Sequence, residues 1–363
     1  MIKKTAVLLI ISLFLTGCAK KSIREEISFS SWGSVSETAI VKKAISEFEA
    51  ENPGIKVNFM HIPQNYFQKI HLLFASNTEP DVIFINNLNL PVYASRLVDL
   101  KGIVDTEAFY PQAIEGLSYE GRLLAVPRDI SELVFYINLD KQKLPPQSWT
   151  IEDMLNIART STQNGVFGIS YEDNTLYLMP YLRYFGGDVL DHDGNYVYNS
   201  EESTRAVDFY KSLRDLYHAA PLKSQAGSST LAQMFMDGKL VMYLSGRWMY
   251  PKISEKAGFN WAVINFPSGK KPQPMDTSGW AISKNSKHKE AAVKLVRFLS
   301  DEKRSEYFTS TGLIVPARIG SSKLLESDKH NERIFIDIIP KLQATNVNKE
   351  YKRLTDSINA GLE

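Results

Sequence analysis

Three of the five tryptophans, Trp32, Trp248 and Trp280, adjoin predicted strands and have a glycine within two residues. An indole ring at such a position can stack on the apolar C–H face of a pyranose, and the glycine lets a ligand approach the backbone closely. Aspartate, asparagine and arginine side chains could form paired hydrogen bonds with hydroxyl groups of the same ligand. The alternative for each tryptophan is a place in the hydrophobic core, which is our interpretation of Trp149 and Trp261. The pattern favours a surface that binds a sugar ring.

Four carboxylates lie near the ends of predicted strands: Asp129, Glu132, Glu172 and Asp173. A glycosidase needs two carboxylates about 5–10 Å apart across the scissile bond, and the sequence leaves that separation open. The chain has no Walker A loop and no GxGxxG, GxSxG or HExxH motif, and its six histidines lack zinc-site spacing. We therefore predict no catalytic residue and no cofactor, and keep an extracytoplasmic hydrolase as one alternative.

The segment 191–202 partly matches the calcium loop of an EF-hand. Oxygen-bearing side chains occupy most of the ligand positions, but Tyr196 stands where the loop requires a glycine. Asp193-Gly194 is a favourable turn sequence by itself. We interpret the segment as a solvated turn and predict no metal site.

The candidate residues lie near the ends of strands that are predicted to form a parallel α/β sheet. Segments 27–31 and 55–59 alternate apolar and polar residues, and 81–85 is almost entirely apolar, which predicts three strands. Apolar residues at helical spacing predict a helix in each interval between them. This βαβαβ order predicts a doubly wound lobe, whose ligand would lie outside the carboxyl ends of the strands, where Trp32 falls.

A second lobe of the same kind is expected after Pro145 and Pro146. Its predicted elements, in chain order, are a strand at 166–171, helices at 176–185 and 201–217, and strands at 240–244 and 261–264. The segment 267–274, rich in Pro, Gly and Lys, indicates a crossing between lobes. We place the N-terminal lobe at 27–136 plus 276–325 and the C-terminal lobe at 137–275 plus 326–363.

The N-terminus indicates export. Lys3 and Lys4 precede an apolar run of about ten residues, which at roughly 15 Å of helix is too short for a hydrocarbon core of about 30 Å. Small residues follow, and then Cys18, the only cysteine of the chain. This order resembles the bacterial lipobox, which implies a signal peptide over 1–17, acylation of Cys18 and a short tether over 18–26. An ordinary cleaved signal is the alternative.

The overall composition excludes some partners. The formal net charge is +1 and 23% of the residues are charged, so no global field draws the protein to nucleic acid. Without the signal peptide the chain is still long enough for two hydrophobic cores.

Short motifs in a fixed order resemble the solute-binding proteins of ABC sugar importers, the family that includes the maltose-binding protein. In chain order they are Ser31-Trp32-Gly33, 80–84, 121–127, 135–138, 146–150, 235–242, Gly246-Arg247-Trp248 and 312–317. The resemblance spans nearly the whole exported chain. It implies two doubly wound α/β lobes joined by crossing strands, with a sugar, expected to be an oligosaccharide, in the central cleft. It further implies a monomeric receptor that closes by a hinge motion and serves an ABC permease.

The resemblance also implies which side chains line the cleft. By position they are Trp32, Asn86, Asp129, Tyr181, Arg247, Trp248, Gly279 and Trp280. The turn at 86–89 is unusually rich in amides, and we expect it to shape ligand choice. A receptor of the same build for an anionic solute, such as a glycerol phosphodiester, is the second alternative, because Arg128, Arg247 and Arg318 could clamp a phosphate.

Overall fold

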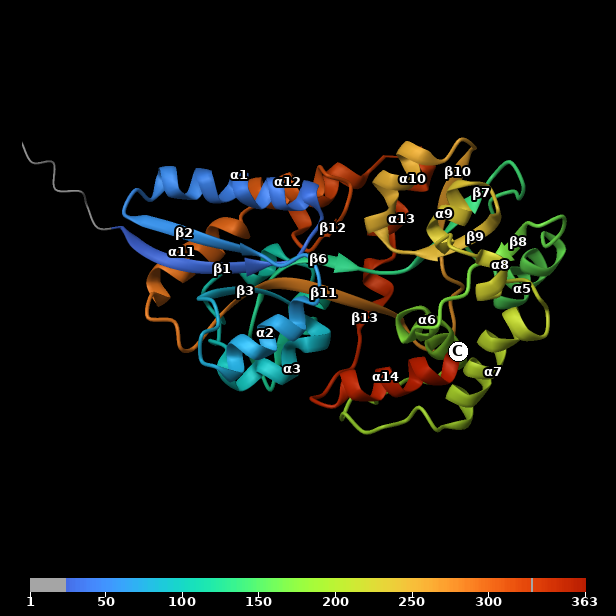
Figure 1. The fold of residues 1–363 in the computed structure, drawn as a ribbon, viewed down its shortest axis with the longest axis horizontal. Helices are drawn as coiled ribbons and strands as arrows, with labels where there is room; N and C mark the ends of the chain where they lie inside the picture. The colour runs from blue at the N-terminus through green and yellow to red at the C-terminus, as the bar shows by residue number, and fades with distance from the viewer. Residues whose placement is uncertain (1–23, 328) are drawn as a thin grey trace, which may run out of the picture.

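The two larger β-sheets lie side by side along the long axis of the molecule (Figure 1). A separate two-stranded sheet is formed by β4 (Ser118–Tyr119) and β5 (Arg122–Leu123). The computed structural model describes residues 24–327 and 329–363, so the predicted signal peptide and Cys18 lie outside the described residues. Within the described ranges, no helix is both long and apolar enough to cross a membrane. A large core cluster fills the lobe of the first sheet and reaches one face of the second sheet, whose other face is covered by a separate cluster.

The larger sheet has seven strands in the order β12-β6-β11-β3-β1-β2, with β13 paired to the start of β11. β1 is parallel to β2 and β3, whereas β11 is antiparallel to β3 and β6, so the predicted βαβαβ unit is confirmed. β1 begins within the segment predicted as a tether. The strands are β1 (Glu25–Ser31), β2 (Ile55–His61), β3 (Val82–Asn86), β6 (Val126–Ser131), β11 (Gln273–Ile282), β12 (Val315–Pro316) and β13 (Leu342–Ala344).

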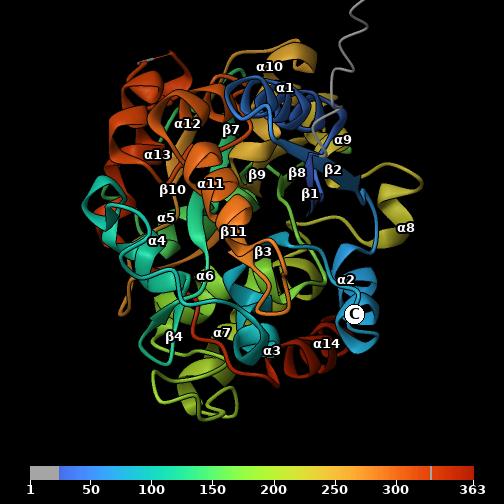
Figure 2. The same cartoon turned by 90° about the vertical axis from the view of Figure 1, so that its left-hand side faces the viewer.

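Helices cover both faces of this sheet, as a doubly wound lobe requires. Figure 2 shows α1 and α12 on one side of the strands and α2 and α3 on the other. α1 starts with a capping box, in which Ser34 accepts from the backbone of Glu37 and Glu37 accepts from the backbone of Ser34. The helices are α1 (Val35–Glu51), α2 (Tyr66–Ala75), α3 (Leu90–Tyr93), α4 (Pro111–Gly116), α11 (Lys289–Leu299) and α12 (Glu302–Thr309).

The smaller sheet has four strands in the order β10-β7-β9-β8, and Trp149 and Trp261 are buried in its lobe as predicted. Thr150 starts α5 with a capping box to Asp153. The strands are β7 (Val134–Asn138), β8 (Phe167–Ile169), β9 (Leu240–Ser245) and β10 (Trp261–Asn265). The remaining helices are α5 (Ile151–Thr160), α6 (Thr175–Phe185), α7 (Glu201–Asp215), α8 (Lys223–Ala226), α9 (Leu231–Met236), α10 (Tyr250–Lys256), α13 (Ile334–Asp337) and α14 (Tyr351–Leu362).

The chain first crosses between the sheets at Glu132 and Leu133. All of β7 pairs with β9 and β10, so this crossing precedes the boundary that we predicted after residue 136. The chain returns to the larger sheet over 266–272, between β10 and β11, close to the crossing that we predicted at 267–274. The last segment is shared, because β13 pairs with β11 of the larger sheet whereas α14 packs against α6 of the smaller lobe.

Candidate ligand-binding cavity

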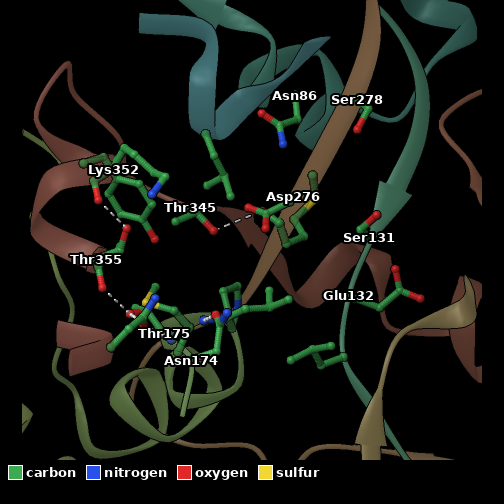
Figure 3. Close-up of a pocket in the computed structure, with 18 of the residues that line it drawn as sticks. Asn86, Ser131, Glu132, Asn174, Thr175, Asp276, Ser278, Thr345, Lys352 and Thr355 are labelled. Atoms are coloured by element: carbon green, nitrogen blue, oxygen red, sulfur yellow. Dashed lines mark hydrogen bonds between the residues drawn. The ribbon is translucent and has the colours of Figure 1, made fainter. Parts of the chain in front are cut away.

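A cavity of about 530 Å³ lies between the two lobes (Figure 3). Its volume falls within the ~300–1,000 Å³ typical of small-molecule sites. The larger lobe contributes residues from the carboxyl ends of β1, β3 and β6 and from β11, which is where an open α/β sheet binds ligands. The smaller lobe contributes the first turns of α6 and Trp248, and α14 forms a further wall.

The larger sheet contributes four polar side chains to the cavity wall. Asn86 of β3 lies opposite Ser278 of β11, and Ser131 of β6 lies opposite Asp276 of β11. Residues two apart on a strand point to the same face, so Asp276 and Ser278 share a face with their partners. All four line the cavity. The pairing register therefore assembles a polar platform from three strands that are distant in sequence.

Trp32 and Trp248, two of the predicted stacking residues, line this cavity from different lobes. Trp32 is supported by an aromatic cluster, with ring centroids 4.1 Å from Phe84 and 5.0 Å from Tyr66. Gly246 leaves room for the indole ring of Trp248, because a Cβ atom at residue 246 would overlap that ring. The two rings therefore have fixed supports and partly exposed surfaces, as a stacking platform requires.

Trp280 does not reach the cavity, so its predicted role as a stacking surface is wrong. Its exposed fraction is 0%, and its ring lies 4.6 Å from Phe84 and 5.4 Å from Phe29. Phe308 of α12 contributes to the same core at 5.9 Å. The ring therefore belongs to the core beneath α12, which the local sequence around Gly279 does not reveal.

Tyr181 is likewise a core residue rather than a cavity residue. Its exposed fraction is 0%, and its ring packs 4.7 Å from Tyr210 and 4.9 Å from Phe266. The cavity side of the same helix is formed instead by its first turns, including Thr175 and Met179. The sequence predicted the helix but not which of its faces is turned to the cavity.

Asp129 and Gly279 lie next to Ser278 in the larger sheet but do not line the cavity. Asp129 is buried and ion-paired to Arg128 at 2.5 Å; burial raises the pKa of its carboxyl group although Arg128 opposes that shift. Gly279 is a packing residue, because a Cβ atom there would meet the carbonyl oxygen of Val126 on the neighbouring strand. Both residues therefore stabilise the larger sheet near the site.

Arg247 was predicted to bind ligand, but it does not line this cavity and instead connects chain segments beside it. It is 4% exposed, its Nε donates to the carbonyl oxygen of Ile314 at 3.1 Å, and it is ion-paired to Glu332. It lines a separate cavity of about 310 Å³ between α10 and the end of α12. The predicted phosphate clamp is not assembled, since Arg128 pairs with Asp129 and Glu37, and Arg318 donates to the carbonyl oxygen of Ser300.

Glu132 is a site feature whose environment the sequence did not indicate. It lies at the first crossing, is 3% exposed and lines the cavity. Neither carboxylate oxygen has a hydrogen-bond partner among the described residues. Burial raises the pKa of this group to about 8, and the attraction of Arg247 only partly opposes that rise. Of the four carboxylates considered for hydrolysis, Glu132 alone lines this cavity.

The C-terminal helix α14 is the second feature that sequence reasoning missed. Five of its residues line the cavity: Tyr351, Lys352, Thr355, Asp356 and Asn359. Their spacing places them on one face of the helix. Asn359 fixes α14 to α6, because its side-chain oxygen accepts from the backbone and hydroxyl of Thr175. The apolar period of 351–362 could have revealed the helix, but not the surface against which it packs.

The calcium-like segment forms a turn held by its own side chains. Asp191 accepts from the backbone of Asn195 at 2.8 Å and from its side chain at 3.0 Å. Across residues 24–327 and 329–363, no group of three or more His, Cys, Asp or Glu side chains is placed to hold a metal.

Comparison with known families identifies the class of protein. The family model described as bacterial extracellular solute-binding protein matches residues 43–332, most of the chain, so the chain belongs to this family. Among curated relatives, the galactooligosaccharide-binding protein of Bacillus subtilis (strain 168) is 24% identical over 335 residues, which cover 84% of this chain and 78% of that protein.

Solved structures confirm the predicted two-lobed fold. An ABC substrate-binding protein from Listeria monocytogenes, in complex with cycloalternan, is similar with a TM-score of 0.84 at 23% identity, covering 93% of this chain and 92% of that one. A Mycobacterium tuberculosis protein in complex with glycerophosphocholine has a TM-score of 0.79 at 20% identity, with the same coverage of both chains. Helix α14 lies beyond the residues that the family model matches.

Proposed function

We propose that this protein binds a neutral saccharide, most simply an oligosaccharide, in the interlobe cavity and delivers it to an ABC permease outside the cytoplasm. The observation that carries the proposal is the joint presence of Trp32 and Trp248, from different lobes, in one cavity with a polar platform. A ligand that stacks on one lobe and contacts the other stabilises the closed arrangement of the lobes, which a permease can then recognise.

The relatives support the saccharide over other solutes. The Bacillus relative is named for galactooligosaccharides and the Listeria structure contains cycloalternan. The cavity itself carries two aspartates, Asp276 and Asp356, against one lysine, Lys352, which is paired to Asp356. Glu132 adds a carboxyl group whose raised pKa keeps its proton. Such a lining suits hydroxyl donors better than a phosphate.

One observation supports the alternative of a receptor for an anionic solute. The Mycobacterium structure of similar fold holds glycerophosphocholine, a phosphodiester. Against it stands the position of Arg128, Arg247 and Arg318, none of which is among the residues that line the cavity. We therefore treat a phosphodiester receptor as the second candidate.

Thermal unfolding with a ligand panel tests both candidates. A ligand at a hundredfold excess over its Kd adds about 2.7 kcal/mol to the free energy of unfolding, which raises the melting temperature measurably. We expect an oligosaccharide to raise it and glycerophosphocholine to leave it unchanged, and the reverse result would favour the phosphodiester receptor. Chromatography of the recovered saccharide checks for hydrolysis, because a receptor releases it intact.

We also propose that the protein is held at the membrane through an acylated Cys18, after removal of residues 1–17. The support is the sequence alone: a basic start, a short apolar run and one cysteine. Replacing Cys18 with Ser should release the protein from washed membranes into the soluble exported fraction. Retention of this variant on the membrane would contradict the lipid anchor at Cys18, but it would not contradict the proposed saccharide binding.

A further inference from the structure

The carboxyl group of Asp276 lies at the start of β11 and is held from two sides of the cavity. The side-chain nitrogen of Asn87 donates to its Oδ1 at 3.1 Å. The hydroxyl of Thr345 lies beside the same carboxyl group (Figure 3) and lowers its pKa through a hydrogen bond, and this hydroxyl also donates to the carbonyl oxygen of Met275 at 3.3 Å. These partners follow β3 and β13, so three distant segments of the chain converge on this one side chain. A lining residue with two fixed protein contacts has a defined orientation before any ligand arrives.

The amide-rich turn at 86–89 is the source of one of these contacts. Asn87 is buried, donates to Asp276 and accepts from the backbone of Thr277 at 3.0 Å, so it is tied to β11 at both ends of its amide. Asn86 and Asn89 bond to each other and close the turn. The turn therefore positions Asp276, whereas the sequence alone suggested only that its amides shape ligand choice.

Asp276 still has unused capacity to accept hydrogen bonds. An ionised carboxylate has about four lone-pair positions; Asn87 occupies one, and Thr345, whose hydroxyl is shared with the carbonyl oxygen of Met275, occupies at most one more. The side chain is only partly exposed, and burial raises its pKa while the bonds from Asn87 and Thr345 lower it. Ligand hydroxyls are the donors that match the remaining positions, and charge-assisted bonds of this kind are the stronger ones.

We propose that Asp276 is a specificity-determining residue that anchors the ligand by accepting hydrogen bonds from its hydroxyl groups, with Asn87 and Thr345 as positioning residues. This inference rests on the proposed function and refines it. A phosphate or carboxylate at this point of the ligand is repelled by the fixed carboxylate, whereas a neutral polyhydroxylated ring is accepted.

The central experiment is Asp276→Asn, which keeps the shape and removes the charge and one acceptor. Affinity is measured by titration calorimetry with the oligosaccharide that gives the largest thermal shift in the unmodified protein. We expect a loss of about 10- to 100-fold, as for other hydrogen bonds to a charged group. Asp208→Asn, on the exposed face of α7, is the matched control and should bind as the unmodified protein does.

Thr345→Val tests the positioning role with little change in volume. Loss of its hydroxyl raises the pKa of Asp276, so the pH at which half the affinity is lost on acidification should move upward; Asp276→Asn should lack that titration. The other titratable groups around the site are Glu132, Tyr351, Lys352 and Asp356, and both variants retain them. A purely structural role of Thr345 would lower the melting temperature without moving this midpoint.

The outcomes distinguish the role of Asp276 from the receptor function. If Asp276→Asn binds within twofold of the unmodified protein at an unchanged melting temperature, Asp276 is not the anchor, while the saccharide receptor stands. If no saccharide of the panel stabilises the unmodified protein, both the proposed function and the role of Asp276 as ligand anchor are wrong.

Discussion

The ring centroids of Trp32 and Phe84 lie 4.1 Å apart, so the indole that lines the cavity is supported by an aromatic residue of β3. The same Phe84 ring lies 4.6 Å from Trp280, which is fully buried. Phe84 thus contacts one tryptophan at the cavity and one in the core. Trp32 and Trp280 have similar surroundings in the sequence, but one lines the cavity and the other lies in the core. Substitutions at tryptophans of the two kinds should therefore change different properties, affinity in one case and stability in the other.

Trp248→Ala should weaken oligosaccharide binding by about 1–3 kcal/mol, because the smaller lobe loses its stacking surface. Titration calorimetry gives the change in Kd. The melting temperature without ligand should change little, since the ring is only partly buried. Unchanged affinity would remove Trp248 from the site.

Gly246→Ala should also weaken binding although it deletes no ring. The added Cβ would overlap the indole of Trp248, so the ring has to leave its position. Tryptophan fluorescence in the presence and absence of ligand reports that movement, and calorimetry reports the affinity. If the fluorescence and affinity of the variant equal those of the unmodified protein, the indole ring can accommodate the added methyl group without leaving the site.

Trp280→Ala should destabilise the fold rather than the complex. Truncation of a buried tryptophan leaves a cavity and typically lowers the free energy of unfolding by about 3–5 kcal/mol. Urea unfolding measures this loss. A large fall in affinity at unchanged stability would instead return Trp280 to the binding site.

Glu132 should make the protein less stable as the pH rises. Its pKa is about 8 in the folded chain against 4.5 for an exposed glutamate, so the folded state retains a proton that the unfolded state releases between these values. Stability is therefore lost as the pH increases through that window. Glu132→Gln should match the unmodified protein near pH 4.5 and exceed it at pH 8.5 in urea unfolding, and parallel pH profiles would argue against a raised pKa.

Arg247→Met should cost about 3–5 kcal/mol of unfolding free energy, because it leaves Glu332 buried without its partner. The double variant Arg247→Met with Glu332→Gln should recover part of that loss. Urea unfolding of both single variants and the double variant gives the coupling energy. Additive losses would mean that the pair does not act as a unit.

The sequence alone was enough to predict most elements. Thr150 caps a helix as its spacing to Asp153 indicates, and the strands at 27–31, 55–59 and 81–85 form the predicted parallel unit. These features depend on local chemistry: capping hydrogen bonds, apolar periodicity and the burial of a central strand. Local signals of this kind survive in any tertiary context.

Tertiary structure decided which predicted residues meet. Trp32, Asn86 and Trp248 line one cavity, whereas Trp280 and Tyr181 are covered by Phe308 and Tyr210, residues that follow them by 28 and 29 positions. Asp276 becomes a candidate anchor only because strand register brings Ser131 beside it and the turn after β3 supplies Asn87. A side chain's neighbours depend on pairing register and on which helix covers it, and both are long-range properties. The sequence by itself determined the two-lobed α/β class and the kind of ligand chemistry, and packing determined where that chemistry is exposed.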